Sequence, residues 1–214
     1  MRAMVPTGTK GIALSPQAMS HLPAHPSTGQ HPRTDPAAVG WRETIRGLDD
    51  IRRVERLAYD DVVPVRSTVQ LLERSATLFP DRPAITFLPT GSVDDDPHVL
   101  TYRTFFDRVR RAANAFHRLG VGPDDAVAFL APTLPDTFIT LFAAQACGRA
   151  CPINYMLSPE KIAGLLAHAG AKVLVALGPD DDLPIAQKID EIRRLSPQLA
   201  HVVSIGDAPI AGVP

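Results

Sequence analysis

The sequence predicts an α/β fold in which helices cover both faces of a parallel β-sheet. Strand-like apolar segments begin near residues 126, 150, 172 and 202, at intervals of 24, 22 and 30 residues. Each interval also holds a segment with the apolar period of a helix. A strand, a crossover helix and a parallel strand fit this spacing, and such crossovers are right-handed. We therefore expect successive βα units in this half of the chain.

Composition and charge exclude several classes of protein. The 214 residues carry 22 Lys and Arg against 23 Asp and Glu, which disfavours a nucleic-acid-binding domain. No run of about 18 apolar residues occurs, so no transmembrane helix is expected. Cys147 and Cys151 are too few for a disulfide framework or a four-ligand zinc site. Both lie in apolar stretches, and we interpret them as buried hydrophobic residues rather than reactive thiols.

Residues 1–40 are predicted to form a disordered leader. They contain 6 of the 21 prolines and show neither a helical nor a strand period. Such a segment buries too little apolar surface to offset the entropy that it loses on ordering. His21, His25 and His31 leave a metal-binding tract as the alternative.

Residues 41–65 are predicted to form an amphipathic helical lead-in that packs on the main body. Apolar residues recur here every three or four positions, with charged residues between them. The acidic residues nearly cancel the arginines, which disfavours the alternative of a basic helix lying on a membrane. The apolar positions are Trp41, Ile45, Leu48, Ile51, Val54 and Leu57.

A helix and a hairpin open the main body, residues 66–214. Ser67 and Gln70 predict a capping box for a helix that Pro80 ends. The apolar segments 84–88 and 99–101 predict a β-hairpin with a long polar loop. The loop carries three consecutive acidic residues, which we interpret as a solvated tip rather than a cation site; they are Asp94, Asp95 and Asp96.

Capping residues place the helices between the strands. Thr101 is the predicted cap of a helix that Gly120 ends, and Ser158 begins a later helix. Thr133 is the predicted cap of the helix that Gly148 ends. Because the Thr133 loop follows a strand, its hydroxyl and the helix N-terminus leave an anion site as the alternative. One more apolar period, 185–195, predicts the helix before the last strand.

The residues by themselves name no reaction. A parallel sheet binds ligands at the carboxyl ends of its strands, but the sequence contains neither a G-x-x-x-x-G-K-[ST] loop nor a G-x-G-x-x-G loop. It contains no G-x-S-x-G nucleophile elbow. Asp124 and Asp125 precede a strand, which is the wrong end for a catalytic pair. We assign no catalytic residue and no metal ligand.

A series of short segments resembles the N-terminal region of adenylate-forming (ANL superfamily) enzymes, the group of acyl-CoA synthetases, luciferases and peptide-synthetase adenylation domains. Order and spacing fit over about 140 of the 214 residues, and the chain looks most like a bacterial acyl-CoA synthetase of the fatty-acid type. The segments are 79–84 (FPDRPA), 100–102 (LTY), 112–115 (AANA), 119–128 (LGVGPDDAVA), 152–154 (PIN), 158–160 (SPE) and 170–175 (GAKVLV).

This resemblance implies a reaction and its cofactors. Family enzymes activate a carboxylic or fatty acid with ATP and Mg²⁺ to an acyl-adenylate and then transfer the acyl group to CoA. In the family a Ser/Thr/Gly-rich loop ending in Pro-Lys holds ATP, and a late lysine is catalytic; neither lies within the 214 residues. We therefore expect an incomplete N-terminal α/β subdomain that is inactive by itself, binds none of these cofactors productively and has the remainder of the enzyme as its partner. The expected location is cytoplasmic, with peripheral membrane contact as the alternative.

One binding segment is carried over from the resemblance. In CoA ligases of this group, the loop before the Ser-Pro-Glu helix lies near the CoA nucleotide. The corresponding residues here are Asn154, Tyr155, Met156 and Leu157, and Tyr155 is expected to stack on or border the nucleotide. The alternative is a purely structural loop in which Met156 and Leu157 pack on the start of the next helix.

Other identities stay open at this stage. A non-catalytic α/β binding or interaction module is the main alternative, and an adenylation domain of a peptide synthetase is a weaker one. A flavodoxin-like domain needs an acidic cluster at the carboxyl end of a strand, and we assign no such cluster.

Overall fold

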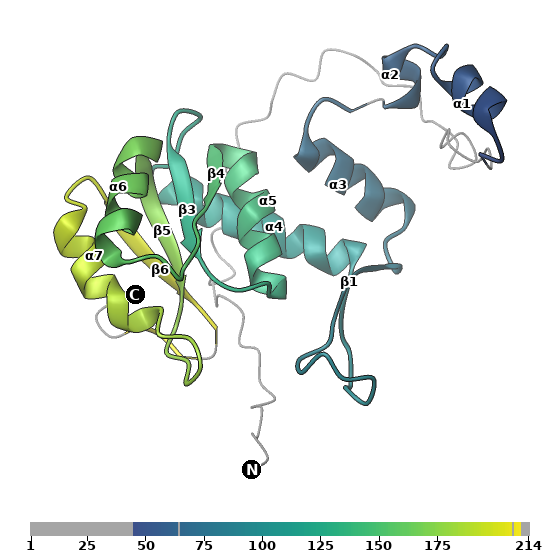
Figure 1. The fold of residues 1–214 in the computed structure, drawn as a ribbon. Coiled ribbons are helices and arrows are strands. Elements are labelled where there is room, and N and C mark those ends of the chain that lie inside the picture. Colours follow the sequence, from purple (N-terminus) through teal and green to yellow (C-terminus); the bar gives the residue numbers. More distant parts are fainter. Residues whose placement is uncertain (1–44, 64, 207, 211–214) are drawn as a thin grey trace.

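The computed structural model describes residues 45–63, 65–206 and 208–210, and the leader predicted for residues 1–40 lies outside them. A four-stranded parallel sheet forms the centre of the fold (Figure 1), in the order β4-β3-β5-β6. This arrangement confirms the predicted α/β class. The strands are β3 (Ala126–Leu130), β4 (Arg149–Pro152), β5 (Ala171–Leu177) and β6 (His201–Ile205).

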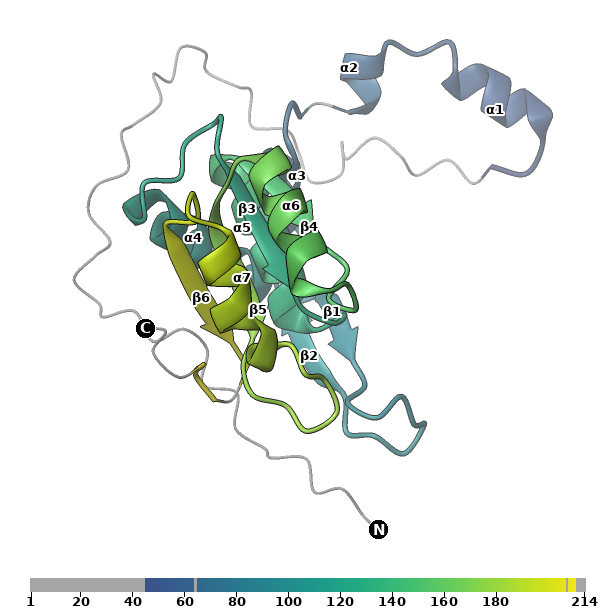
Figure 2. The ribbon, with the colours of Figure 1, turned by 60° about the vertical axis from the view of Figure 1, so that its left-hand side comes forward.

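Helices cover both faces of this sheet, as Figure 2 shows. On one face lie α4 (Tyr102–Arg118) and α5 (Pro135–Cys147), with α3 (Thr68–Leu78) packed beside them. On the other face lie α6 (Pro159–Ala169) and α7 (Ile189–Leu195), the latter preceded by the short 3-10 helix η3 (Ala186–Lys188). The crossover from β3 to β4 runs through α5, and the crossover from β4 past β3 to β5 runs through α6. The two crossovers run in opposite directions along the sheet, so they lie on opposite faces.

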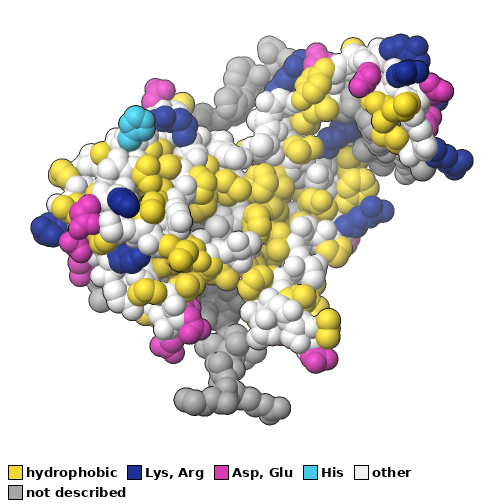
Figure 3. Space-filling model, in the orientation of Figure 1, with side chains coloured by type: hydrophobic (Ala, Val, Ile, Leu, Met, Phe, Trp, Pro, Cys, Tyr) yellow, Lys and Arg dark blue, Asp and Glu magenta, His cyan; other side chains and the backbone are white. Residues whose placement is uncertain are grey.

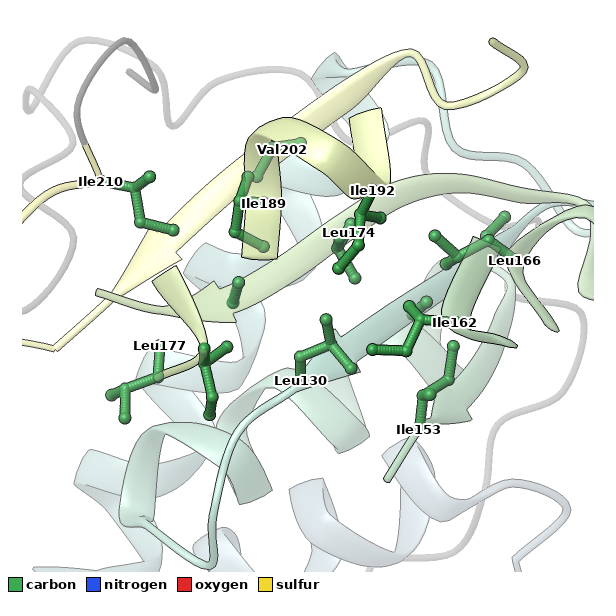
Figure 4. Packing of buried hydrophobic residues seen from close by; sticks show 14 of the residues in the cluster. Leu130, Ile153, Ile162, Leu166, Leu174, Leu177, Ile189, Ile192, Val202 and Ile210 are labelled. Carbon is green, nitrogen blue, oxygen red and sulfur yellow. The ribbon is translucent and has the colours of Figure 1, made fainter. Parts of the chain in front are cut away.

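Side chains along each central strand alternate between the two faces of the sheet, and this alternation divides the core into two halves. In β3, Ala128 and Leu130 belong to the core half under α6 and α7, whereas Val127 and Phe129 belong to the half under α4 and α5. Successive side chains of a strand point to opposite faces, so an all-apolar strand serves both layers. Figure 4 shows Leu130 beside Ile162 in the first half.

Local signals set the helix ends. The Ser67 Oγ atom accepts a hydrogen bond from the amide of Gln70 at 3.1 Å, as predicted. The Gln70 side chain accepts from the Arg66 amide at 2.7 Å, one residue earlier than a capping box requires. Thr101 Oγ1 accepts from the Thr104 amide at 3.3 Å and caps α4. Gly170 ends α6 with a φ of 63°, a conformation that favours glycine.

The predicted hairpin is confirmed. Strands β1 (Pro83–Phe87) and β2 (His98–Thr101) pair antiparallel and pack near α4. In the acidic loop between them, Asp95 accepts hydrogen bonds from the Thr90 amide at 2.7 Å and from the Thr90 hydroxyl at 2.6 Å. The Thr90 hydroxyl is the main cause of the lowered pKa of Asp95. This acid therefore closes the loop.

The lead-in differs from its prediction. It forms two short helices, α1 (Leu48–Val54) and α2 (Tyr59–Val62), separated by a turn. Within the described part of the chain, α1 buries none of its residues, and Leu48 is 70% exposed. The predicted packing of this apolar face on the main body is wrong for α1, because periodicity shows that a face is apolar but not that a surface meets it.

Two basic side chains join the turns at the amino ends of the strands. Lys172 donates hydrogen bonds to the Gly120 carbonyl and to Asp125 Oδ2, the latter at 3.3 Å. Arg149 donates to the carbonyls of Asp124 at 2.7 Å and Ala169 at 3.1 Å. Asp125 also accepts from the Gly122 amide at 2.8 Å. This edge of the sheet is therefore occupied by structural contacts.

We expect Asp125 to make the fold sensitive to acid. The Gly122 amide, and then Lys172 and Arg149, lower the pKa of Asp125 in the folded state. A lowered folded pKa stabilises the fold above the ordinary carboxyl pKa, and this contribution disappears as pH falls below about 4. In Asp125→Asn, the melting temperature should fall less between pH 5 and pH 2.5 than it does in the parent protein. A series of thermal melts across this pH range measures the difference. Asp124→Asn, at an exposed side chain without a hydrogen bond among the described residues, should leave the parent slope unchanged.

Candidate functional site

The carboxyl ends of the parallel strands gather three loops at one edge of the sheet. They follow β3 (131–134), β4 (153–158) and β5 (178–184). The chain leaves β3 and β5, which are neighbours, toward helices on opposite faces. Such a reversal is the usual place for a ligand in an open α/β sheet. The described helices include none long and apolar enough to cross a membrane.

The loop after β3 corrects one prediction. Leu134, not Thr133, is the N-cap of α5, and no side chain caps this helix. Thr137 in the first turn donates its hydroxyl to the Pro132 carbonyl at 2.6 Å and so fixes the loop from within the helix. Pro135 in the first helical position moves the boundary by one residue, because its fixed φ suits that position. Thr133 is exposed and makes no side-chain hydrogen bond with the described residues.

The loop after β4 contains the four residues carried over from the resemblance. Asn154 Oδ1 accepts a hydrogen bond from the Met156 amide at 2.9 Å, and the Asn154 carbonyl accepts from the Leu157 amide at 3.2 Å. Tyr155 and Leu157 are half-buried and pack against the core under α6 and α7. Met156 is 78% exposed, so it does not pack on the next helix, whereas Leu157 does reach the core. The turn thus presents Met156 and the outer side of Tyr155 at the edge.

Lys188, the last residue of η3, anchors this loop. Its ammonium group donates hydrogen bonds to the carbonyls of Tyr155 at 2.8 Å and Leu157 at 3.1 Å. The side chain is half-buried, where a charged donor to a carbonyl is stronger than in water. No pattern in the sequence indicates this contact, because Lys188 lies 33 residues from Tyr155.

Removing this anchor should loosen the loop. In Lys188→Met both carbonyls lose a charged donor, and such bonds contribute about 1.5–3 kcal/mol each. We expect the amides of Met156 and Leu157 to exchange with solvent at least about tenfold faster, because their protection depends on the closed turn. Site-resolved hydrogen exchange measures this. Lys161→Met removes an exposed lysine on α6 and should leave both rates unchanged; equal rates in Lys188→Met would refute the anchoring role.

The loop after β5 holds acidic residues that the sequence analysis missed. Asp180, Asp181 and Asp182 follow β5 almost directly, so the prediction that no acidic cluster lies at the carboxyl end of a strand is wrong. Their position three residues after the strand was the available signal. Asp180 Oδ1 accepts hydrogen bonds from the amides of Asp182 at 3.0 Å and Leu183 at 2.9 Å. The first acid therefore shapes the turn, and no group of three metal-ligating side chains forms within the described ranges.

The two cysteines were predicted to be buried, and the structure shows them only partly so. Both are free and half-buried. Burial raises the pKa of Cys147 to about 11, and its thiol contacts the Ala143 carbonyl at 3.3 Å. Burial also raises the pKa of Cys151. A nucleophilic thiol needs a lowered pKa, so the environment of both favours the neutral form.

Comparison with models of known protein families identifies the family of this chain. The model of the AMP-binding enzyme family matches residues 72–212, which cover the sheet and most of its helices. The chain belongs to the AMP-binding enzyme family.

Individual members of the AMP-binding family support this assignment. A marinolic acid–CoA ligase from a Pseudoalteromonas species is 30% identical over 167 residues, 78% of this chain and 26% of the ligase. A long-chain-fatty-acid–CoA ligase from Thermus thermophilus is 37% identical over 105 residues, 49% of this chain and 19% of the ligase. The crystal structure of an anthranilate–CoA ligase with anthranoyl-AMP has a TM-score of 0.57 at 26% identity, covering 70% of this chain and 27% of the ligase.

These comparisons also fix the extent of the match. The chain spans about a quarter or less of the length of the curated relatives that it matches. Its fold is that of the first part of the N-terminal domain of adenylate-forming enzymes, and the sequence resemblance to an acyl-CoA synthetase is confirmed.

Proposed function

We propose that these 214 residues are part of an acyl-CoA synthetase that activates a carboxylic acid, of the fatty-acid type, with ATP and Mg²⁺ and transfers it to CoA. The observation that carries the proposal is the AMP-binding family match over residues 72–212, with CoA ligases among the relatives. The open carboxyl edge of the sheet, at the reversal between β3 and β5, supports it.

Within this function, the loop 154–157 borders the CoA nucleotide. Three features support the role: the loop lies at the carboxyl edge, Met156 is exposed, and Lys188 holds the backbone in place. The half-buried ring of Tyr155 offers a flat apolar surface at the same edge. An aromatic side chain held in this way can stack on a base at little entropic cost.

Residues 1–214 alone do not catalyse the reaction. Acyl-adenylate formation requires cationic stabilisation of the departing pyrophosphate and alignment of the carboxylate with the α-phosphorus. The sequence holds no Ser/Thr/Gly-rich loop ending in Pro-Lys, and the lysines at the edges of the sheet are used in structural contacts. ATP, Mg²⁺ and CoA therefore do not bind these residues productively.

ATP–pyrophosphate exchange tests both statements. Residues 1–214 should give no exchange with fatty acids of any chain length, and clear exchange would refute the claim of inactivity. A polypeptide extended by the reading frame that follows codon 214 should give exchange that depends on a carboxylic acid, and then a thioester with CoA. A stop codon directly after Pro214, with a monodisperse 23.0 kDa protein in native extract, would favour the non-catalytic module instead.

A further inference from the structure

Lys188 links two segments that are distant in sequence at the carboxyl edge of the sheet. It belongs to η3, in the connection between β5 and α7, and its ammonium group reaches back to the loop after β4. There the carbonyls of Tyr155 and Leu157 both accept hydrogen bonds from it. The ion pairs between described residues do not involve Lys188, so its charge serves these two carbonyls. A charged donor bound to two backbone acceptors fixes a loop more firmly than a neutral donor does.

The base of the Lys188 side chain is itself held by the core. Ile185 and Ile189, on either side of it, are 1% and 0% exposed and lie in the core half under α6 and α7. Tyr155 and Leu157 pack against the same core half. Because both ends of the link rest on one core, the ammonium group has a fixed position from which it sets the backbone of the loop.

This link determines what the loop presents to a ligand. Met156 lies between the two bound carbonyls and is 78% exposed, and its amide donates to Asn154 Oδ1. Over the parallel sheet and its helices, the basic side chains visible in Figure 3 are scattered singly. The ammonium group of Lys188 is occupied by carbonyls. What the described residues offer to a nucleotide at this loop is therefore a fixed shape.

We propose that Lys188 is a positioning residue for thioester formation, because it holds the loop 154–157 in the conformation that binds CoA. This inference rests on the proposed function. In that step the CoA sulfur bonds to the acyl carbon, the bond from this carbon to the AMP oxygen breaks, AMP leaves with the electron pair, and the thiol proton passes to water. Lys188 acts through the backbone of the loop. Its removal lowers the fraction of molecules that are ready to bind CoA, and the apparent affinity falls with that fraction.

The two half-reactions of the longer polypeptide, read past codon 214, test the proposal. In Lys188→Met, the KM for CoA in thioester formation should rise at least about tenfold, whereas the KM for ATP in ATP–pyrophosphate exchange should change less than about twofold. Lys188→Arg should recover most of the loss, because a guanidinium group can donate to both carbonyls. Arg193→Met removes the same charge from an exposed side chain of α7 and should leave both KM values unchanged.

Dephospho-CoA, which lacks the 3′-phosphate, distinguishes positioning from direct contact. A positioning residue should raise the KM for CoA and for dephospho-CoA by the same factor in Lys188→Met. A rise confined to CoA would assign the ammonium group to the phosphate itself and overturn the proposal. Equal rises in the KM for CoA and for ATP, or no recovery in Lys188→Arg, would show a general structural role and overturn it as well.

A binding measurement separates this proposal from the proposed function. Isothermal titration of the longer polypeptide with CoA requires no turnover. A parent that binds CoA without ATP–pyrophosphate exchange would overturn the proposed function, and a larger Kd in Lys188→Met would still support the positioning role. A parent that forms the thioester, with an unchanged KM for CoA in Lys188→Met, would overturn the positioning role alone. A parent that neither binds CoA nor gives exchange would overturn both. Far-UV circular dichroism verifies that each variant is folded.

Discussion

Leu166→Ala is expected to lower the free energy of unfolding by about 2–5 kcal/mol. Leu166 is fully buried in α6, in the core half that also contains Ile162, Leu174 and Ile192. Its truncation removes apolar area from the core and leaves a cavity that the rigid sheet cannot close. For a marginally stable domain, a loss of this size removes much of the total stability. Denaturant unfolding at 25 °C, with the parent and variant slopes compared, measures it.

The adjacent residue supplies the control. Leu165 has the same side chain on the same helix but is 44% exposed. Leu165→Ala should cost about 0.5 kcal/mol or less, because the alanine fills a position that is already partly in water and alanine is a good helix former. Similar losses in the two variants would mean that α6 is not packed on the sheet as the structure shows.

Gly148→Ala is expected to destabilise the fold by about 1–3 kcal/mol, although a single methyl group is added. A Cβ atom at this position would lie 2.6 Å from the Asp125 carbonyl oxygen and 2.7 Å from that of Gly122. Both oxygens belong to the backbone of the turn before β3, so the turn itself must move. The φ of Gly148 is −165°, an extended value that any residue adopts, and the cost is therefore one of space.

A second glycine tests this explanation, because its replacement by alanine should stabilise the fold instead of destabilising it. Gly164 lies inside α6, and a Cβ atom on its Cα would meet no described atom within 4 Å beyond the helix's own backbone. Gly164→Ala should raise the free energy of unfolding by about 0.5–1 kcal/mol, because alanine loses less backbone entropy than glycine in a helix. Thermal or denaturant unfolding of both variants decides the matter, and destabilisation of both would point to a general intolerance of side chains instead.

Patterns that extend over a few residues were readable from the sequence. The βα spacing, the hairpin and the caps at Ser67 and Thr101 depend on neighbours along the chain, and the structure confirms them. Gly148 was predicted to end α5, and it does, but the close approach of the turn before β3 that requires a glycine there was not visible. The cap of α5 was predicted one residue too early. Thr133 is a preferred capping residue, but Pro135 occupies the first helical position, which makes Leu134 the N-cap.

The candidate site depended more on tertiary structure. The resemblance pointed to residues 154–157, but sequence periodicity could not show that Lys188 holds their backbone or that Met156 faces outward. The acidic residues after β5 can be read directly from the sequence, but their place at the carboxyl end of a strand was not recognised.

The sequence by itself determined the class of the fold, the position of each strand and the relationship to adenylate-forming enzymes, because apolar period, caps and motif spacing are local properties of the chain. The tertiary structure alone decided the strand order β4-β3-β5-β6, the anchoring of the loop after β4 and the exposure of the apolar face of α1. These features arise where segments distant in sequence meet, and an apolar face in a sequence does not indicate which surface will cover it.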